Sequence, residues 1–353
     1  MKIPRPAVLL TAATLTLCTA CGASGTSGTG STSAKGITPG VITDIGGLGD
    51  HGFNDLASTG LQAAERKLGV KGRVVVPQTP ADYANNLDQL AQNGAQPVFG
   101  IGFTFQDPIT AAAKRYPDTH FGIIDATVDA PNVASLVFRE EEGSYLAGVL
   151  AGSMTQRKTD YTDPANKAVG FIGGQESPLI EKFGAGFEQG VKSACADCEV
   201  LFQYVGTTTK AFSDPGTAGE IARNMRSKGA DVIYHAAGAS GDGLFKVAQD
   251  EKFFAIGVNV DQAATNPNAP ILTSVLKRVD TAVATTIEAQ AKGGWKAGTQ
   301  SFGLSDGGIA LAPYGKFDAL VPADVKQAVE DARKKIAGGS LKVATTRAAV
   351  GTP

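Results

Sequence analysis

From Gly40 onward, short β-branched runs alternate with helical stretches, and this alternation is the strongest constraint on the fold. In chain order the first series comprises a strand at 41–44, a helix at 55–68, a strand at 73–77, a helix at 80–92, a strand at 97–101, a helix at 107–115 and a strand at 121–125. Strands that alternate with helices form βαβ units and parallel sheets. The first third of the chain therefore predicts one α/β lobe.

The same rhythm then restarts, which predicts a second lobe. The second series comprises a helix at 143–152, a strand at 168–172, a helix at 180–192, a strand at 200–204, a helix at 217–228, and strands at 232–235 and 255–260. Each series covers about 100 residues, a typical size for one domain. We expect an N-terminal lobe of residues 37–138 plus about 259–302, and a C-terminal lobe of residues 139–258 plus about 303–353. The part from Ile271 onward would cross back to complete both lobes and end in a charged helix near 322–336.

The N-terminal segment predicts export and anchoring. Lys2 and Arg5 precede an apolar run at 7–17, and Cys18-Thr-Ala-Cys21 follows this run. This pattern is typical of a signal peptide at 1–20 with lipidation at Cys21, although Cys18 stands where such a site usually has leucine. Residues 21–36 then form a Gly/Ser/Thr tether. We expect a protein lipid-anchored on the extracytoplasmic face of the cell membrane; ordinary cleavage and release is the alternative.

Composition limits the possible partners. Hydrophobic residues make up 42% of the chain and charged residues 19%, as in globular proteins. The net charge is −2, and removal of Lys2 and Arg5 with the leader gives −2 − 2 = −4. No basic cluster stands out, so no nucleic-acid partner is expected.

Two cysteines remain after the leader and Cys21, in the sequence Cys195-Ala-Asp-Cys198. A local disulfide between Cys195 and Cys198 is the favoured interpretation in an oxidising compartment. A redox-active or zinc-binding pair is the alternative. It has less support, because there is no second cysteine pair and the three histidines are scattered. No metal site is predicted.

Polar residues follow several predicted strands, where ligands bind in parallel α/β sheets. These are Asp44 with the loop 46–54, Asp125, the loop 236–243 and Asp261. Any one aspartate could simply cap the helix or turn that follows it. Three at equivalent positions predict a polar ligand cleft.

The loop Gly47-Leu-Gly-Asp-His-Gly52 has the spacing GxGxxG, yet we do not expect a dinucleotide there. The second strand ends in Val76-Pro77-Gln78 without the acid that would bind a ribose, and an exported protein would not meet a cytoplasmic cofactor. The motifs GxxxxGK[ST], GxSxG and HExxH are also absent from the sequence. We therefore predict no cofactor, and phosphoryl-transfer, serine-hydrolase and zincin activities have no support in the sequence.

Six segments together resemble the basic membrane protein (PnrA-like) family of nucleoside-binding lipoproteins. They are Val41–Asp55 (VITDIGGLGDHGFND), Asn132–Gly148 (NVASLVFREEEGSYLAG), Val169–Gly174 (VGFIGG), Gly229–Gly238 (GADVIYHAAG), Gly257–Gln262 (GVNVDQ) and Leu272–Asp280 (LTSVLKRVD). The segments follow the family's order over roughly residues 38–315. The resemblance implies a type I periplasmic-binding-protein fold, with two Rossmann-like lobes, a hinge of three crossovers and a ligand cleft between the lobes. It also implies a binding protein rather than an enzyme, one that delivers its solute to the permease of an ABC importer.

The resemblance also implies roles for individual residues. Phe53 and Phe212 would stack on the two faces of a base, which would couple binding to lobe closure. Asp44, Asn54 and Asp125 would bind the edge of the base, while Asp261 and Lys277 would bind the ribose. The loop that begins at Gly238 would let backbone amides approach the sugar. Taken alone, Phe53 would be a core anchor, Phe212 a hydrophobic staple and Lys277 a solvated lysine.

Other functions remain open at this point. The ligand could be another small polar solute such as a sugar or autoinducer, or the fold could serve a surface receptor or adhesin. A nucleoside hydrolase would need a metal cluster or an activated water that the sequence does not supply. His51-Gly52 departs from the family's pattern before Phe-Asn, and His51 would line the mouth of the cleft.

Overall fold

The computed structural model describes residues 36–350. The predicted signal peptide, Cys21 and the tether up to residue 35 lie outside this range. Among the described residues, no helix combines the length and the apolar character needed to cross a membrane.

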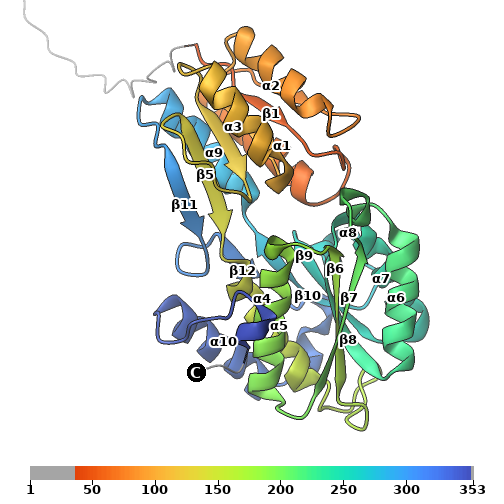
Figure 1. The fold of residues 1–353 in the computed structure, drawn as a ribbon. Coiled ribbons are helices and arrows are strands. Elements are labelled where there is room, and N and C mark those ends of the chain that lie inside the picture. Colours follow the sequence, from red (N-terminus) through yellow and green to blue (C-terminus); the bar gives the residue numbers. More distant parts are fainter. Residues whose placement is uncertain (1–35, 351–353) are drawn as a thin grey trace, which may run out of the picture. The chain divides into compact units, whose positions relative to one another are not determined.

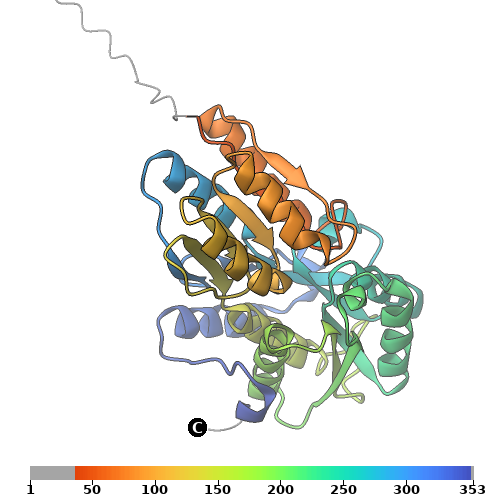
Figure 2. The same ribbon diagram turned by 45° about the horizontal axis from the view of Figure 1, so that its top comes forward.

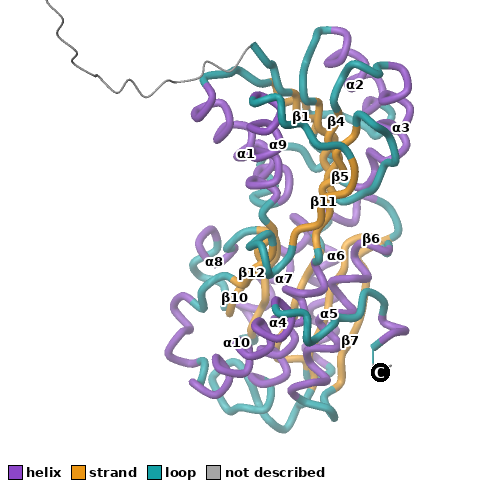
Figure 3. Tube along the Cα trace, turned by 90° about the vertical axis from the view of Figure 1, so that its left-hand side faces the viewer, coloured by secondary structure: helices purple, strands orange, loops and turns teal. Residues whose placement is uncertain are grey.

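The first lobe is built on a six-stranded sheet with the order β11-β5-β4-β3-β1-β2, and all its strands are parallel (Figure 1). Its strands are β1 (Gly40–Ile42), β2 (Arg73–Val75), β3 (Val98–Ile101), β4 (Phe121–Ile124), β5 (Val133–Phe138) and β11 (Gly298–Phe302). The helices α1 (Phe53–Leu68) and α9 (Val279–Ala291) lie on one face, and α2 (Asp82–Gln92) and α3 (Gln106–Arg115) lie on the other (Figure 3). Because both faces are covered, the central strands β1, β3 and β4 are buried along their whole length.

The second lobe repeats this plan with the strand order β12-β10-β9-β8-β6-β7. Its segments are drawn mainly in green and teal in Figure 2. Its strands are β6 (Ala168–Gln175), β7 (Glu199–Gly206), β8 (Ala230–Ala236), β9 (Phe254–Asn259), β10 (Ile271–Lys277) and β12 (Ile309–Leu311). Its helices are α4 (Glu140–Met154), α5 (Pro178–Ala194), α6 (Pro215–Ser227), α7 (Gly241–Glu251), the short α8 (Gln262–Thr265) and α10 (Ala323–Ala337). Only the edge strand β12 runs antiparallel to its neighbour, β10.

Helices α4 and α5 pack closely because glycines face the neighbouring backbone. A Cβ atom at Gly148 would lie 2.1 Å from the carbonyl oxygen of Phe187, and one at Gly190 would lie 2.1 Å from that of Tyr145. A side chain at either position would force the helices apart. Gly148 and Gly190 therefore serve this contact.

The chain passes between the lobes three times: after β5, after β10 and after β11. The second passage differs from our expectation, which placed residues from about 259 in the N-terminal lobe. Strand β10 pairs with β9 from Ile271 to Leu276, so the chain stays in the second sheet through Lys277. The side chains of β10 are nearly all buried between β9 and β12, which is why this strand completes the second core.

Candidate functional site

A cavity of about 180 Å³ lies at the carboxyl ends of the strands and takes its lining from both sheets. Seven of the predicted residues line it: Asp44, Phe53, Asn54, Asp125, Phe212, Gly238 and Lys277. Other lining residues are Ile45, Gly46, Gly49, Asp50, Gly102, Phe103, Thr104, Leu179, Ile180, Phe183, Thr209, Ser213, Ala236, Ala239, Val258 and Asn259. The cavity therefore combines apolar walls with a few convergent polar groups, as small-molecule sites do.

Asp44 and Asn54 form a hydrogen-bonded pair at the end of β1 and the start of α1. The Asn54 Nδ2 donates to Asp44 Oδ1 at 2.8 Å, and the Asp44 backbone amide donates to Asn54 Oδ1 at 3.1 Å. Burial raises the pKa of the Asp44 carboxyl, while the hydrogen bond from Asn54 opposes this shift. Each side chain thus fixes the other beside the cavity.

The glycine-rich loop before α1 is held by its own carboxylates. Asp50 accepts hydrogen bonds from the backbone amides of Gly52, Asn54 and Asp55 at 2.8–3.1 Å. Asp55 accepts from the amides of Gly49 and His51 at 2.9 and 3.0 Å. The side chains of Asp50 and Asp55 already occupy the backbone amides that a phosphate would need, and both are negatively charged as a phosphate is. The GxGxxG spacing therefore does not form a phosphate-binding loop here.

Lys277 is buried in a cluster of charges where the second crossover begins. Its side chain is 2% exposed, so it is not the solvated lysine of the alternative interpretation. Its Nζ lies 2.6 Å from the Asp125 carboxylate and 2.9 Å from Glu140 Oε1. The Nζ of Lys182 on α5 lies 3.5 Å from Glu140 Oε2. Two acids and two lysines therefore meet in one neutral group, which we call the hinge cluster.

Burial and charge act against each other within the hinge cluster. Burial raises the pKa of Asp125 to about 6, although Lys277 opposes the shift. Burial alone would lower the pKa of the Lys277 ammonium, but Asp125 and Glu140 together raise it. The Lys277 charge also lies 5.3 Å from the centre of the Phe53 ring, which places a cation beside one aromatic wall.

Phe53 and Phe212 reach the cavity from different lobes. Phe53 is the first residue of α1, and Phe212 ends a single 3₁₀ turn at Thr209–Phe212 after β7. The Phe212 ring lies against the backbone of Gly174, where an added Cβ would be 2.3 Å from Phe212 Cε1. Both phenylalanines are half-buried and line the cavity.

Gly238 holds the turn beside Phe212. Its φ of +56° is in the left-handed region, and a Cβ atom there would lie 3.1 Å from the Phe212 carbonyl oxygen. The Ser240 hydroxyl donates to the Ala211 carbonyl at 2.8 Å and accepts from the Asp214 amide at 2.7 Å. These bonds join the 238–240 turn to the turn that carries Phe212.

Asp261 does not line the cavity; it precedes the short helix α8, and its Oδ1 is buried without a hydrogen bond among the described residues. Asn259, two residues earlier, does line it and has a φ of +68°. Left-handed backbone at a non-glycine residue is uncommon and often marks a functional position. Sequence reasoning missed Asn259, although it lies one residue before the end of the predicted strand 255–260, and it also missed Glu140.

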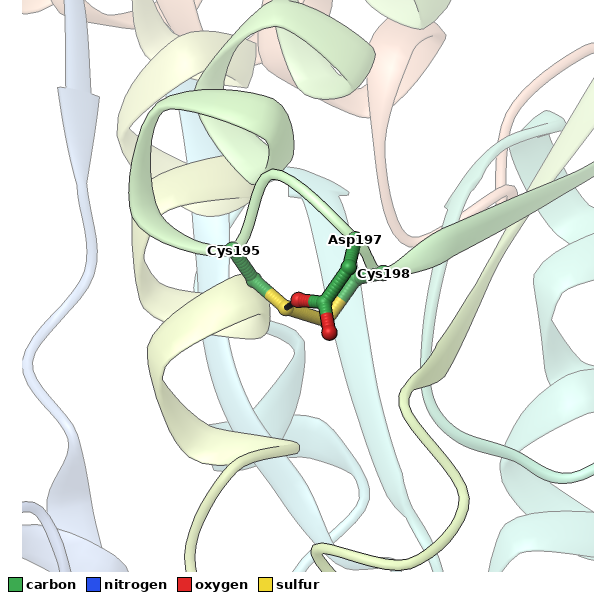
Figure 4. A group of neighbouring side chains, drawn as sticks. All are labelled: Cys195, Asp197 and Cys198. Carbon is green, nitrogen blue, oxygen red and sulfur yellow. Dashed lines mark hydrogen bonds between the residues drawn. A yellow bond between two sulfur atoms is a disulfide. The ribbon is translucent and has the colours of Figure 1, made fainter.

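His51, His235 and the pair Cys195 and Cys198 are not part of the cavity lining. His235 is fully buried, and its Nε2 lies 2.9 Å from Gln262 Oε1; burial lowers its pKa to about 4. His51 is exposed and does not line the cavity. Cys195 and Cys198 form a disulfide in the turn between α5 and β7, with Asp197 beside them (Figure 4). Their sulfur atoms bind each other, so they do not supply thiolates for a metal.

Sequence comparison with known families gives a match over most of the chain. The family described as "ABC transporter substrate-binding protein PnrA-like" matches residues 37–344. The "CD4+ T-cell-stimulating antigen" of Listeria monocytogenes is 34% identical over 88% of this chain and 89% of its own length. The "ABC transporter nucleoside-binding protein BmpA" of Lactococcus lactis is also 34% identical, over 86% of this chain and 88% of its own.

Solved structures show the same architecture. An ABC transporter solute-binding protein from Aeropyrum pernix superposes with a TM-score of 0.79 at 28% identity, covering 88% of this chain and 94% of that one. A solute-binding protein from Conexibacter woesei gives a TM-score of 0.68 at 24% identity, covering 88% and 99%. The two-lobed α/β fold expected from the sequence is thus confirmed.

Proposed function

Because this chain belongs to the PnrA-like family of ABC transporter substrate-binding proteins, we propose that it captures nucleosides, purine nucleosides above all, between its two lobes. Members of this class bind small ligands and work with the permease components of a transporter; they are not enzymes. The relative from Lactococcus lactis is named as a nucleoside-binding protein, and this supports the same ligand class here.

The observation that carries the proposal is the pair of phenylalanines from opposite lobes at one cavity. Phe53 comes from the first lobe and Phe212 from the second, and both line it. A planar base held between two rings gains about 1–3 kcal/mol per stacked face. Stacking on both faces requires the lobes to approach each other, so ligand binding would favour the closed form.

Polar groups beside the rings suit the remainder of a nucleoside. The Asp44–Asn54 pair offers carboxylate and amide atoms that could bind the edge of a base. The Asp125 carboxylate would bind the base edge in the same way. Lys277 would bind ribose oxygens from its place beside Phe53. For Asp261 the proposed ribose contact requires a movement of the segment 259–261, because Asp261 does not line the cavity.

We also propose that lipid at Cys21 anchors the protein to the extracytoplasmic face of the membrane. Relatives named as lipoproteins in Pyrococcus support this, as does a relative in Borreliella burgdorferi named "Basic membrane protein B". The test is replacement of Cys21 by alanine, followed by fractionation of membranes and medium. An unchanged membrane fraction for Cys21→Ala would refute anchoring through this residue.

A thermal-shift screen of the chain from residue 37 tests the ligand class, since every described strand and helix lies after that residue. The panel contains nucleosides, free bases, ribose and other sugars. A ligand at 100 times its Kd stabilises the folded state by about 2.7 kcal/mol. Stabilisation by sugars but by no nucleoside would refute the proposal. For a ligand that binds, Phe212→Ala should weaken affinity by about 5- to 150-fold without unfolding the protein.

A further inference from the structure

In the hinge cluster the buried Lys277 ammonium has two carboxylate partners, one more than it needs for charge neutralisation. Asp125 Oδ2 accepts a hydrogen bond from Lys277 Nζ at 2.6 Å, and Glu140 Oε1 lies 2.9 Å from the same nitrogen. The side chains of all three are at most 4% exposed. Burying a second carboxylate is costly, so it needs a reason beyond neutralising Lys277.

The two carboxylates differ in whether a ligand can reach them. Asp125 follows β4 in the first lobe and lines the cavity. Glu140 begins α4 just after the first crossover, is fully buried and does not line the cavity. Both Asp125 oxygens lie 2.6 Å from Lys277 Nζ, so the contact that a ligand at the cavity would replace is the one to Lys277. Only Asp125 can therefore exchange a protein contact for a contact to a ligand.

We propose that Glu140 is a positioning residue: it is the permanent counter-ion of Lys277 and leaves Asp125 free to exchange its contact with Lys277 for a hydrogen bond to the ligand. The inference rests on the proposed function, because it concerns the same cavity. Without Glu140, a ligand that engaged Asp125 would leave the Lys277 ammonium buried and unpaired, which proteins avoid. With Glu140, the ammonium stays paired before and after binding.

Lys182 completes the arrangement from the second lobe. Its Nζ contacts the other oxygen of Glu140 and also donates to the Phe138 carbonyl at 3.4 Å. Lys182 is about one-third exposed, so water screens its charge more than that of Lys277. The ion pair of Glu140 with Lys277 is therefore stronger than its ion pair with Lys182.

Glu140→Gln tests the proposal, with Glu141→Gln as the matched control. Glu141 is the next residue of α4, yet it is not among the charges that shift the pKa of Lys277. At pH 8, above the Glu141 pKa of about 7, its substitution by glutamine removes a negative charge as Glu140→Gln does, so the variants are compared at that pH. We expect Glu140→Gln to weaken binding of adenosine, guanosine or inosine by about tenfold or more, because Asp125 would then remain tied to Lys277. Glu140→Asp should recover most of that loss, and Lys182→Met should change affinity by less than about threefold. Equal affinities for Glu140→Gln and Glu141→Gln would overturn the proposal.

An NMR titration of the ligand-free protein gives a second readout that does not depend on nucleoside binding. The Lys277 side-chain signal is followed by [¹³Cε]lysine labelling and assigned by its loss in Lys277→Arg. Asp125, Glu140 and Lys182 are the charged groups that face it. The pKa of Lys277 should be lower in Glu140→Gln than in the unsubstituted protein or in Glu141→Gln; an unchanged value would overturn the proposal. Should Glu140→Gln fail to fold, the same comparison is made with Glu140→Asp, for which we also expect a lower pKa. If the unsubstituted protein binds no nucleoside, the proposed function fails while this titration still decides the role of Glu140.

Discussion

Gly174→Ala should move the Phe212 ring and weaken ligand binding. The added methyl carbon would lie 2.3 Å from Phe212 Cε1 and 2.4 Å from Cδ1. Since carbon atoms prefer separations of about 3.5–4.0 Å, the ring must move by roughly 1 Å or more. Gly174 is near the end of β6 and has no left-handed φ, so the backbone itself accepts alanine.

The size of the effect follows from what the ring is proposed to do. A stacked base gains about 1–3 kcal/mol from one aromatic face, and losing part of this would weaken affinity by roughly tenfold. Forcing extra volume into a packed site costs about 1–3 kcal/mol of stability in addition. Isothermal titration with a nucleoside identified by the thermal-shift screen measures the first quantity, and urea unfolding measures the second.

Gly170→Ala is the matched control for this variant. It makes the same change in the same strand, but its methyl group would meet Met225 Sδ at 2.7 Å, and Met225 does not line the cavity. It should therefore lose stability with little change in affinity. In the double variant Gly174→Ala/Phe212→Ala, the alanine at 174 should add nothing to the loss caused by Phe212→Ala. Full affinity in Gly174→Ala, or an additional loss in the double variant, would refute the stacking role of Phe212.

Three further predictions concern stability. Asp50→Ala removes the acceptor for the first amides of α1 and should lower the free energy of unfolding by about 1–2 kcal/mol in urea titrations; a loss below about 0.3 kcal/mol would contradict its capping role. Burial raises the pKa of Glu141 from its ordinary 4.5 to about 7, so the folded state loses stability as pH rises from about 4.5 to 7. Glu141→Gln should therefore be more stable than the unsubstituted protein at pH 8 by up to about 3 kcal/mol, but not at pH 4.5. Burial lowers the pKa of His235 to about 4, so the unfolded chain takes up a proton that the folded protein does not as pH falls below about 6.5. The stability of the unsubstituted protein relative to His235→Gln should therefore fall by about 2 kcal/mol between pH 7 and pH 5, and parallel pH profiles would show that His235 is not held neutral.

The strands that could be predicted from the sequence are those that lie in the middle of a sheet. β3 and β4 are buried on both faces, so each appears as an uninterrupted apolar run. The edge strand β11 has the sequence GTQSF and is largely exposed, so it has no such run; β12 (IAL) is apolar but only three residues long. Periodicity also says nothing about which sheet a strand joins, and this is why β10 was assigned to the wrong lobe.

The predicted site shows a similar division. Asp44, Asp125 and Gly238 follow strands, and topology alone brings them to the cavity. Lys277 has no local signal of burial, because its partner Asp125 is 152 residues away and Arg278 follows it. Glu140 is one of three successive glutamates, and only the packing of α4 distinguishes it from its neighbours. Which charges pair depends on contacts between distant segments, and local patterns do not contain these.

The three crossovers also impose an order on how the molecule can be completed during synthesis. The first sheet and its helix α1 are made early, but α9 and β11, which cover α1 and extend the sheet, come only after β10 of the second lobe. Gly60 on α1 leaves room for the later helix α9, because a Cβ atom at Gly60 would lie 2.4 Å from the Asp280 carbonyl oxygen. A chain emerging from its N-terminus therefore carries an unfinished first lobe, with an apolar helix face uncovered, until residue 302 has appeared.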